Sequence, residues 1–304
     1  MTWKYKAKKY GPACVWYGCG IGASLAYIYP HTLGLEKYKE AITETSEGKP
    51  VELDSEIAVV AQEIKNHFKW RQSSLFKRPD FDFVQTTQPL DFVQRGSVTS
   101  RWGAVIGVPI LFTTSSLQAA RESPVTVLQK YNINVTEDEG TNILEFFTLS
   151  PAAKKFALAR EMYLADSFYI FASVIAINLA FFSTYAVGAG LSNVLSLFLP
   201  GPGAVLISFL SLIPALGYGC IKFHDWYTRV MLAKSDKEAA FMDSEVAAGG
   251  IEYYSTLIAR KQVQGNVSSS VDTESLFDMK WRKKELSFEE RKQRLEKALE
   301  KLSS

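Results

Sequence analysis

Residues 167–221 contain no Asp, Glu, Lys or Arg, and this uncharged block restricts the possible folds more than any other stretch. A buried helix of a soluble protein, about 12 residues long, does not require such a gap, whereas two membrane crossings of about 20 residues each with a turn between them would fill it. The sequence therefore predicts a transmembrane hairpin. Its crossings are expected at 167–187 and 204–221, with an uncharged reversal at 188–203.

A second apolar stretch lies near the N-terminus. Residues 1–10 carry four lysines and no acid, and residues 11–30 are uncharged. We expect a basic tail at 1–10 and a first transmembrane helix at 11–30, in which Gly18 and Gly22 allow another membrane helix to pack closely. A secretory signal peptide is the rival interpretation, but no small-residue cleavage site precedes a polar mature start.

Residues 31–166 are polar and mixed, which predicts a soluble α+β part. Apolar residues recur at helical spacing after Asp54, which predicts an amphipathic helix at 55–70. The tetrapeptide Asp-Phe-Val-Gln occurs at 82–85 and again at 91–94, and a β-hairpin is the simplest explanation of the repeat. Further strands are expected at 102–112 (or a buried loop there), 125–128 and 142–149.

Helices are expected on both sides of the hairpin. Ser150 is a suitable N-cap and Pro151 suits the first helical position, so a helix should run from here to about Asp166. Beyond the hairpin, residues 222–262 are expected to form a helical return that packs on the soluble part, with a helix opening at Ser235.

The last part of the chain carries two adjacent glycines and then a highly charged tail. Gly249 and Gly250 each cost about 1 kcal/mol relative to Ala in a helix interior, a cost typical of a close helix contact. Residues 263–286 have the composition of a linker, and a capping box at Ser287 begins a charged C-terminal helix at 287–304. Its dense mixed charge favours a solvated helix over one that binds a partner.

Charge and cysteine content disfavour several functions. A net charge of +2 offers no field for nucleic acid, and three cysteines do not make a disulfide scaffold. Cys220 and His224 are i, i+4 neighbours, but two such residues at a membrane exit are more typical of packing than of a metal site. Crossings without an ionisable residue provide no polar path for a channel or transporter. We expect no cofactor, metal, nucleic acid or small-molecule substrate.

Three strings carry a resemblance to a known family. They are Leu-Ser-Pro-Ala-Ala-Lys-Lys and its continuation at 149–161, Ala-Gly-Gly-Ile-Glu-Tyr-Tyr at 248–254, and Gly-Ala-Val-Ile-Gly-Val-Pro at 103–109. Together with the three expected crossings, their order resembles the transmembrane protein 177 family. The resemblance implies a multi-pass protein of the mitochondrial inner membrane that helps assemble cytochrome c oxidase. It would bind newly made subunit 2 together with that subunit's membrane chaperone.

The orientation of such a protein in the membrane is open. The basic tail at 1–10 favours a matrix-facing N-terminus and a soluble part in the intermembrane space. Basic residues that flank the hairpin argue for the reverse.

A more distant likeness is to membrane zinc proteases of the HtpX type. In those enzymes a Ser-Pro helix start leads to Leu-Ala-His-Glu-x-x-His, a membrane hairpin follows, and a later helix carries Glu-x-x-Ala-Asp. This chain has the same order, with Leu-Ala-Arg-Glu-Met-Tyr-Leu at 158–164 and Glu-Val-Ala-Ala-Gly at 245–249. The likeness implies a zincin-like soluble domain that is degenerate and is interrupted by the transmembrane hairpin.

The residues at the positions of the zinc site do not suit a metal. Arg160 and Leu164 stand where two imidazoles would be needed, and neither side chain is a zinc ligand. Glu161 and Glu245 match the base and the third ligand, whereas Gly249 replaces the supporting Asp. We predict a pseudo-protease. Arg160 could pair with Glu245, so that a salt bridge substitutes for the zinc link between two helices, or both side chains could simply face solvent.

Two functions from different classes remain. The first is a non-catalytic assembly factor that acts by binding a membrane subunit. The second is a membrane-bound, metal-dependent hydrolase with an unrecognised site, which the missing ligands disfavour.

Overall fold

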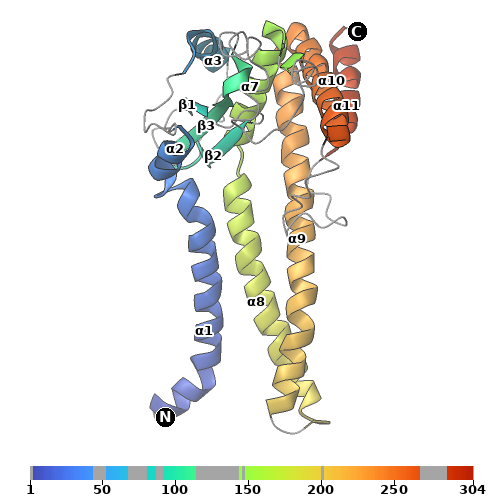
Figure 1. Cartoon of the computed structure of the whole chain (residues 1–304). Helices are drawn as coiled ribbons and strands as arrows, with labels where there is room; N and C mark the ends of the chain where they lie inside the picture. Colours follow the sequence, from blue (N-terminus) through green and yellow to red (C-terminus); the bar gives the residue numbers. More distant parts are fainter. Residues whose placement is uncertain are drawn as a thin grey trace. The chain divides into compact units, whose positions relative to one another are not determined.

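The protein is represented by a computed structural model whose elements Figure 1 shows. The structure describes residues 3–43, 53–67, 81–86, 92–113, 144–145, 148–199, 202–267 and 286–303. The chain divides into two compact units. The hairpin unit consists of Met1–Pro30 and Phe168–Thr228, and the α+β unit consists of His31–Ser167 and Arg229–Ser304.

Two helices in the described part of the chain are long and apolar enough to cross a membrane. They are α8, Tyr169–Leu195, and the Gly203–Ala240 part of α9, which spans Pro202–Ala240. Only 17% and 13% of their most apolar windows are buried, so neither resembles the core helix of a soluble protein. The first crossing expected at 11–30 lies on α1, Trp3–Ile28, which does not meet the same criterion and stays a prediction.

Both helices of the hairpin are longer than predicted. Helix α8 continues to Leu195, so much of the predicted reversal at 188–203 is helical. In a bilayer, no water is available to hydrogen-bond backbone groups that leave a helix, so glycine does not end the helix there. This explains why Gly188 and Gly190 lie within α8. Helix α9 continues past the predicted end at 221 as far as Ala240.

The helix expected to open at Ser235 begins later in the structure. The Ser235 hydroxyl donates a hydrogen bond of 2.9 Å to the Leu232 carbonyl of its own helix, so the side chain is not available as a cap. The chain leaves α9 after Ala240, and α10 spans Ser244–Val267. The first residues of the predicted linker at 263–286 therefore belong to α10, while residues 268–285 lie outside the described part.

Within the hairpin unit, α1 packs on α8. Trp16 Nε1 donates to the Phe181 carbonyl at 2.8 Å, and Asn178 Nδ2 donates to Ser24 Oγ at 2.7 Å. The glycine at this contact is Gly20, where a Cβ atom would lie 3.0 Å from Phe181. A Cβ at Gly18 or Gly22 would meet nothing within 4 Å, because these two residues share the opposite face of the helix.

The α+β unit contains a three-stranded sheet of β1, Phe81–Thr86, β2, Val93–Ser97, and β3, Gly103–Pro109, in the order β1-β3-β2. Strand β3 is parallel to β1 and antiparallel to β2. The hairpin predicted from the repeat at 82–85 and 91–94 is therefore wrong. Strand β3 is buried along its whole length, so it takes the central position in which both edges are paired.

Among the described residues, the α+β unit contains α2, Leu35–Thr43, α3, Ser55–His67, α7, Pro151–Ala165, α10, α11, Phe288–Ser303, and the part of α9 from Arg229 onward. Short 3-10 helices occur at Tyr29–His31 and Ile110–Phe112. The predicted helices at 55–70 and from Ser150 to about Asp166 are confirmed over their described residues, and the strand predicted within 102–112 is β3. In the segment 142–149, residues 144–145 are helical rather than extended, and the candidate strand at 125–128 lies outside the described part.

Helix α11 is not the solvated helix that its charge predicted. Arg291 is 2% and Leu295 1% exposed, and the helix packs along α10. Phe288 and Leu299 contact the same hydrophobic core, so one apolar stripe decides the position of this charged helix.

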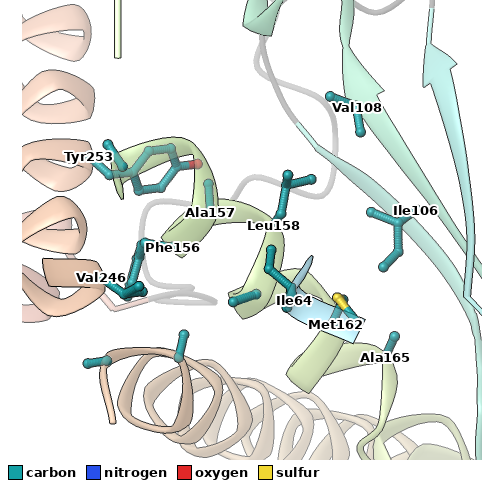
Figure 2. Close-up of a cluster of buried hydrophobic side chains, with 14 of the residues drawn as sticks. Ile64, Ile106, Val108, Phe156, Ala157, Leu158, Met162, Ala165, Val246 and Tyr253 are labelled. Carbon is teal, nitrogen blue, oxygen red and sulfur yellow. The ribbon is translucent and has the colours of Figure 1, made fainter. Parts of the chain in front are cut away.

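Helix α7 lies at the centre of the core. Figure 2 shows Phe156 on the side of α10 near Val246, and Leu158 on the side of β3 near Ile106. Met162 is also fully buried, and each such side chain stabilises the fold by about 2 kcal/mol relative to an exposed one. The molecule is thus mostly helical with a small sheet, and the finer zincin-like arrangement stays a prediction.

Candidate functional site

The start of α7 is fixed to α10 by a carboxylate. The Ser150 hydroxyl accepts the Ala153 N–H at 3.1 Å, as an N-cap does. Glu252 of α10 accepts both remaining donors of Ser150, from the backbone N–H at 2.8 Å and from the hydroxyl at 2.6 Å. The position of α7 along α10 is therefore set by two hydrogen bonds to one charged group.

Two glycines allow α10 to touch its neighbours. A Cβ atom on Gly249 would collide with the Ala152 carbonyl group and the Ala153 nitrogen at the first turn of α7. A Cβ on Gly250 would lie 2.7 Å from the Phe156 ring and 2.8 Å from Leu295 of α11. The helix backbones of α7 and α10 are thus in direct contact at Gly249, which aligns the side chains further along α7.

A buried ion pair joins α9 to α11. Arg291 donates two hydrogen bonds of 2.7 Å to the two carboxylate oxygens of Asp236, and their side chains are only 2% and 6% exposed. The Tyr254 hydroxyl of α10 donates to the same carboxylate at 2.7 Å, and the Arg291 guanidinium lies 4.7 Å from the centre of the Tyr254 ring. Three helices therefore meet at one bidentate ion pair.

Arg160 of α7 extends this cluster. Its Nη2 atom lies 2.7 Å from Glu161 Oε1, and its Nε atom lies 4.0 Å from Asp236 Oδ1. A hydrogen bond of 3.4 Å joins its Nη1 atom to the Tyr253 hydroxyl. We call Arg160, Glu161, Asp236, Arg291, Tyr253 and Tyr254 the ion cluster; it contains two guanidinium groups and two carboxylates, so its formal charge is balanced.

Burial and charge each shift the pKa values of the arginines and tyrosines of the ion cluster. Burial alone would lower the pKa of the Arg160 guanidinium, but the negative charge of Glu161 and the other groups around it raise that pKa well above its usual value. Burial raises the pKa of the Tyr253 hydroxyl, and burial together with the charge of Asp236 raises that of Tyr254. The arginines are thus charged and the tyrosines neutral at physiological pH, which suits a structural lock rather than proton transfer.

The structure brings together only part of the predicted degenerate site. Arg160 and Glu161 belong to the ion cluster, and Leu164 is half-buried on the same helix. Glu245 is exposed in the first turn of α10, where its backbone N–H bonds the Asp243 carboxylate at 3.3 Å. Of the two alternatives for Arg160 and Glu245, the salt bridge is not formed: among the described residues, the acidic partners of Arg160 are Glu161 and Asp236. A carboxylate at a helix N-terminus is already favoured by the helix dipole and needs no cation.

The cluster offers no ligand set for zinc. No group of three His, Cys, Asp or Glu side chains suited to a metal ion occurs in the part of the chain that the structure describes. The guanidinium of Arg160 occupies the region instead, and a positive group beside Glu161 opposes a second cation.

Sequence reasoning missed Asp236, Arg291 and Glu252. A signal for Arg291 exists: it lies three residues after Phe288 and four before Leu295, on the apolar stripe of α11. Asp236 similarly falls between Leu232 and Ala240, both buried. A single charge on an apolar stripe indicates a buried, paired residue.

Comparison with known proteins agrees with this architecture. The model of one family, described as transmembrane protein 177, matches residues 45–280. The chain belongs to the transmembrane protein 177 family. The match includes most of the described α+β unit and both candidate membrane spans, and the family's name carries no enzyme designation.

Curated relatives from several vertebrates carry the name transmembrane protein 177. The chain is 27% identical to the Homo sapiens protein over 214 residues, which are 70% of this chain and 66% of the relative. It is 24% identical to the Danio rerio protein over 262 residues, 84% of this chain and 80% of the relative. The chain thus spans slightly less than two thirds of the human relative. No solved structure matches it significantly.

Proposed function

We propose that this protein is a non-catalytic assembly factor of the mitochondrial inner membrane. It binds newly made cytochrome c oxidase subunit 2 together with that subunit's membrane chaperone, and stabilises both. Family membership and the two candidate membrane spans support a role beside a membrane protein, and the resemblance to the family supplies the identity of the partner.

The observation that carries the non-catalytic part of the proposal is the position of Arg160. It stands where the protease likeness requires an imidazole, and it is held against Glu161 at 2.7 Å. The carboxylate that would activate water is therefore engaged by a permanent cation. A rigid helical core of this kind suits a binding scaffold.

Capture of newly made subunits tests the binding. The full chain, tagged and expressed in mitochondria, is precipitated in mild detergent after labelling of mitochondrial translation products. We expect subunit 2 to be enriched over the other labelled products and the chaperone to be recovered with it. Gly249→Leu, which separates α7 from α10, should lose both, whereas Gly190→Ala, where the added methyl group meets nothing, should retain them. Equal recovery of every labelled subunit, or of none, contradicts the proposal.

Metal content tests the rival function. Stoichiometric zinc in purified protein that is lost on Glu161→Gln or Glu245→Gln would establish a metal-dependent hydrolase instead.

Location and orientation are tested separately, by protease protection of tagged termini in intact and swollen mitochondria. We expect the chain to remain in the carbonate-resistant inner-membrane fraction.

A further inference from the structure

A groove with a basic rim lies between the C-terminal part of α9 and α11. Its volume is about 260 Å³, and α9 and the residue after it contribute Ala233, Asp236, Lys237 and Phe241. Helix α11 contributes Arg294, Leu295, Lys297, Ala298 and Lys301. All of these residues belong to the α+β unit.

The groove is positively charged. Four of its lining residues are basic, and its one acidic residue, Asp236, is already neutralised by Arg291, which forms two hydrogen bonds of 2.7 Å to it. Arg294 also pairs with Glu290 at 3.0 Å. Both side chains are about half exposed, and Glu290 does not line the groove. Lys237 and Lys297 are both exposed, so their charges face solvent at the rim.

The floor of the groove is apolar. Phe241 is 45% exposed although it is a large aromatic residue, and its ring lies 5.5 Å from the Lys237 ammonium group. The small residues Ala233 and Ala298 line the same groove. A partly exposed aromatic side chain with a charged rim is typical of the anchor position in a protein interface.

The spacing of the rim cations identifies the occupant. Arg294, Lys297 and Lys301 recur at i, i+3 and i+7 along α11, so they form a ridge about 10 Å long. One phosphate group reaches only part of such a ridge, whereas a helix with acidic residues at the same spacing faces all of it. The volume is below the roughly 300 Å³ at which small-molecule sites begin, and it holds one or two apolar side chains rather than paired acyl chains.

We propose that this groove binds an acidic amphipathic helix of a protein partner, which places its carboxylates on Arg294, Lys297, Lys301 and Lys237 and an apolar side chain against Phe241. The inference goes beyond the proposed function, because it assigns a surface and a recognition chemistry whichever protein carries the helix. It can therefore fail while the capture of subunit 2 succeeds, and the reverse also holds.

Peptide binding to the full chain in detergent tests the groove. The probe is a fluorescent amphipathic peptide of Leu and Glu, about four helical turns long, and its counterpart has Lys in place of Glu. We expect the Glu peptide to bind about tenfold more tightly than the Lys peptide, and to weaken with added salt. The double variant Lys237→Glu/Lys297→Glu should weaken Glu-peptide binding about tenfold and strengthen binding of the Lys peptide.

Matched variants separate binding from folding. Lys292→Glu reverses a charge on α11 outside the groove and should leave peptide binding unchanged, and Phe241→Ala should weaken it without altering thermal unfolding. Equal binding of both peptides, or no effect of the double variant, overturns the proposal. If short-chain phosphatidylglycerol binds with the same dependence on Lys237 and Lys297 while the Glu peptide does not, the groove recognises a lipid headgroup and the proposal is also overturned.

Discussion

Arg291 of α11 and Asp236 of α9 form a bidentate ion pair at 2.7 Å with both side chains shielded from water. The Tyr254 hydroxyl also donates to Oδ1 of this carboxylate, and Arg160 Nε lies 4.0 Å from the same oxygen. The charged C-terminal helix is thus attached to the core by its own charge as well as by its apolar stripe.

Asp236→Asn should destabilise the α+β unit strongly. The substitution leaves the Arg291 guanidinium buried without its counter-charge, and breaking such a pair costs about 3–5 kcal/mol. Thermal unfolding of the full chain in detergent measures the loss, and limited proteolysis should release α11 first. Glu290→Gln removes an exposed pair of similar chemistry and should cost less than about 1 kcal/mol, so equal effects of the two variants would contradict the role of burial.

Gly249→Ala should be unusually costly for so small a change. The added methyl group would collide with the backbone of Ala152 and Ala153, which cannot move aside like a side chain. We expect a loss of about 2–3 kcal/mol, in the range for overpacked cores, although Ala favours a helix over Gly. Gly18→Ala, where the added Cβ meets nothing within 4 Å, serves as the control in the same unfolding assay.

Glu252→Gln should loosen the start of α7. The carboxylate accepts two hydrogen bonds from Ser150, whereas an amide offers a single acceptor oxygen. The expected loss is about 1–3 kcal/mol, accompanied by faster amide hydrogen exchange over the first turn of α7. If Glu245→Gln, at an exposed position of the same helix, has an equal effect, the hydrogen bonds to Ser150 are not the cause.

His31 should make the α+β unit sensitive to acid. Burial, with the nearby charge of Arg95, lowers the pKa of His31 to about 4. Its Nδ1 atom accepts a hydrogen bond of 3.3 Å from the backbone N–H of Gly96, which requires a neutral imidazole. As the pH falls, His31 therefore takes up its proton at a lower pH in the folded protein than in the unfolded chain, where the pKa of histidine is about 6.5. The stability from neutral His31 is complete above pH 6.5 and is lost as the pH falls toward 4, by about 2–3 kcal/mol.

Thermal unfolding at several pH values checks this dependence. His31→Asn keeps an acceptor for Gly96 but cannot titrate, so its midpoint should fall less than that of the wild type between pH 7 and pH 5. Parallel decreases in the two proteins would show that other groups cause the acid sensitivity.

Features that depend on neighbouring residues could be predicted from the sequence. Ser150 and Pro151 define the start of α7 by capping alone, and the uncharged block at 167–221 contains α8 and the apolar part of α9. Gly249 indicated a close helix contact because glycine inside a helix needs a reason.

Features that depend on pairing between residues far apart in the chain could not be predicted from the sequence. The repeat at 82–85 and 91–94 fits a hairpin locally, yet β3 displaces that pairing because it is the most apolar of the three strands. The ion cluster draws its members from α7, α9, α10 and α11, and nothing in the local sequence of Asp236 names Arg291 as its partner. The same limit explains why the sequence could not decide whether Arg160 pairs with Glu245.

The separation of Asp236 and Arg291 along the chain, 55 residues, has a consequence for biogenesis. A polypeptide that emerges in order from a ribosome or an import channel presents the aspartate long before its arginine. Until then the carboxylate lacks its counter-charge, so we expect α11 to dock only once the chain is complete and a product truncated before Arg291 to be less stable.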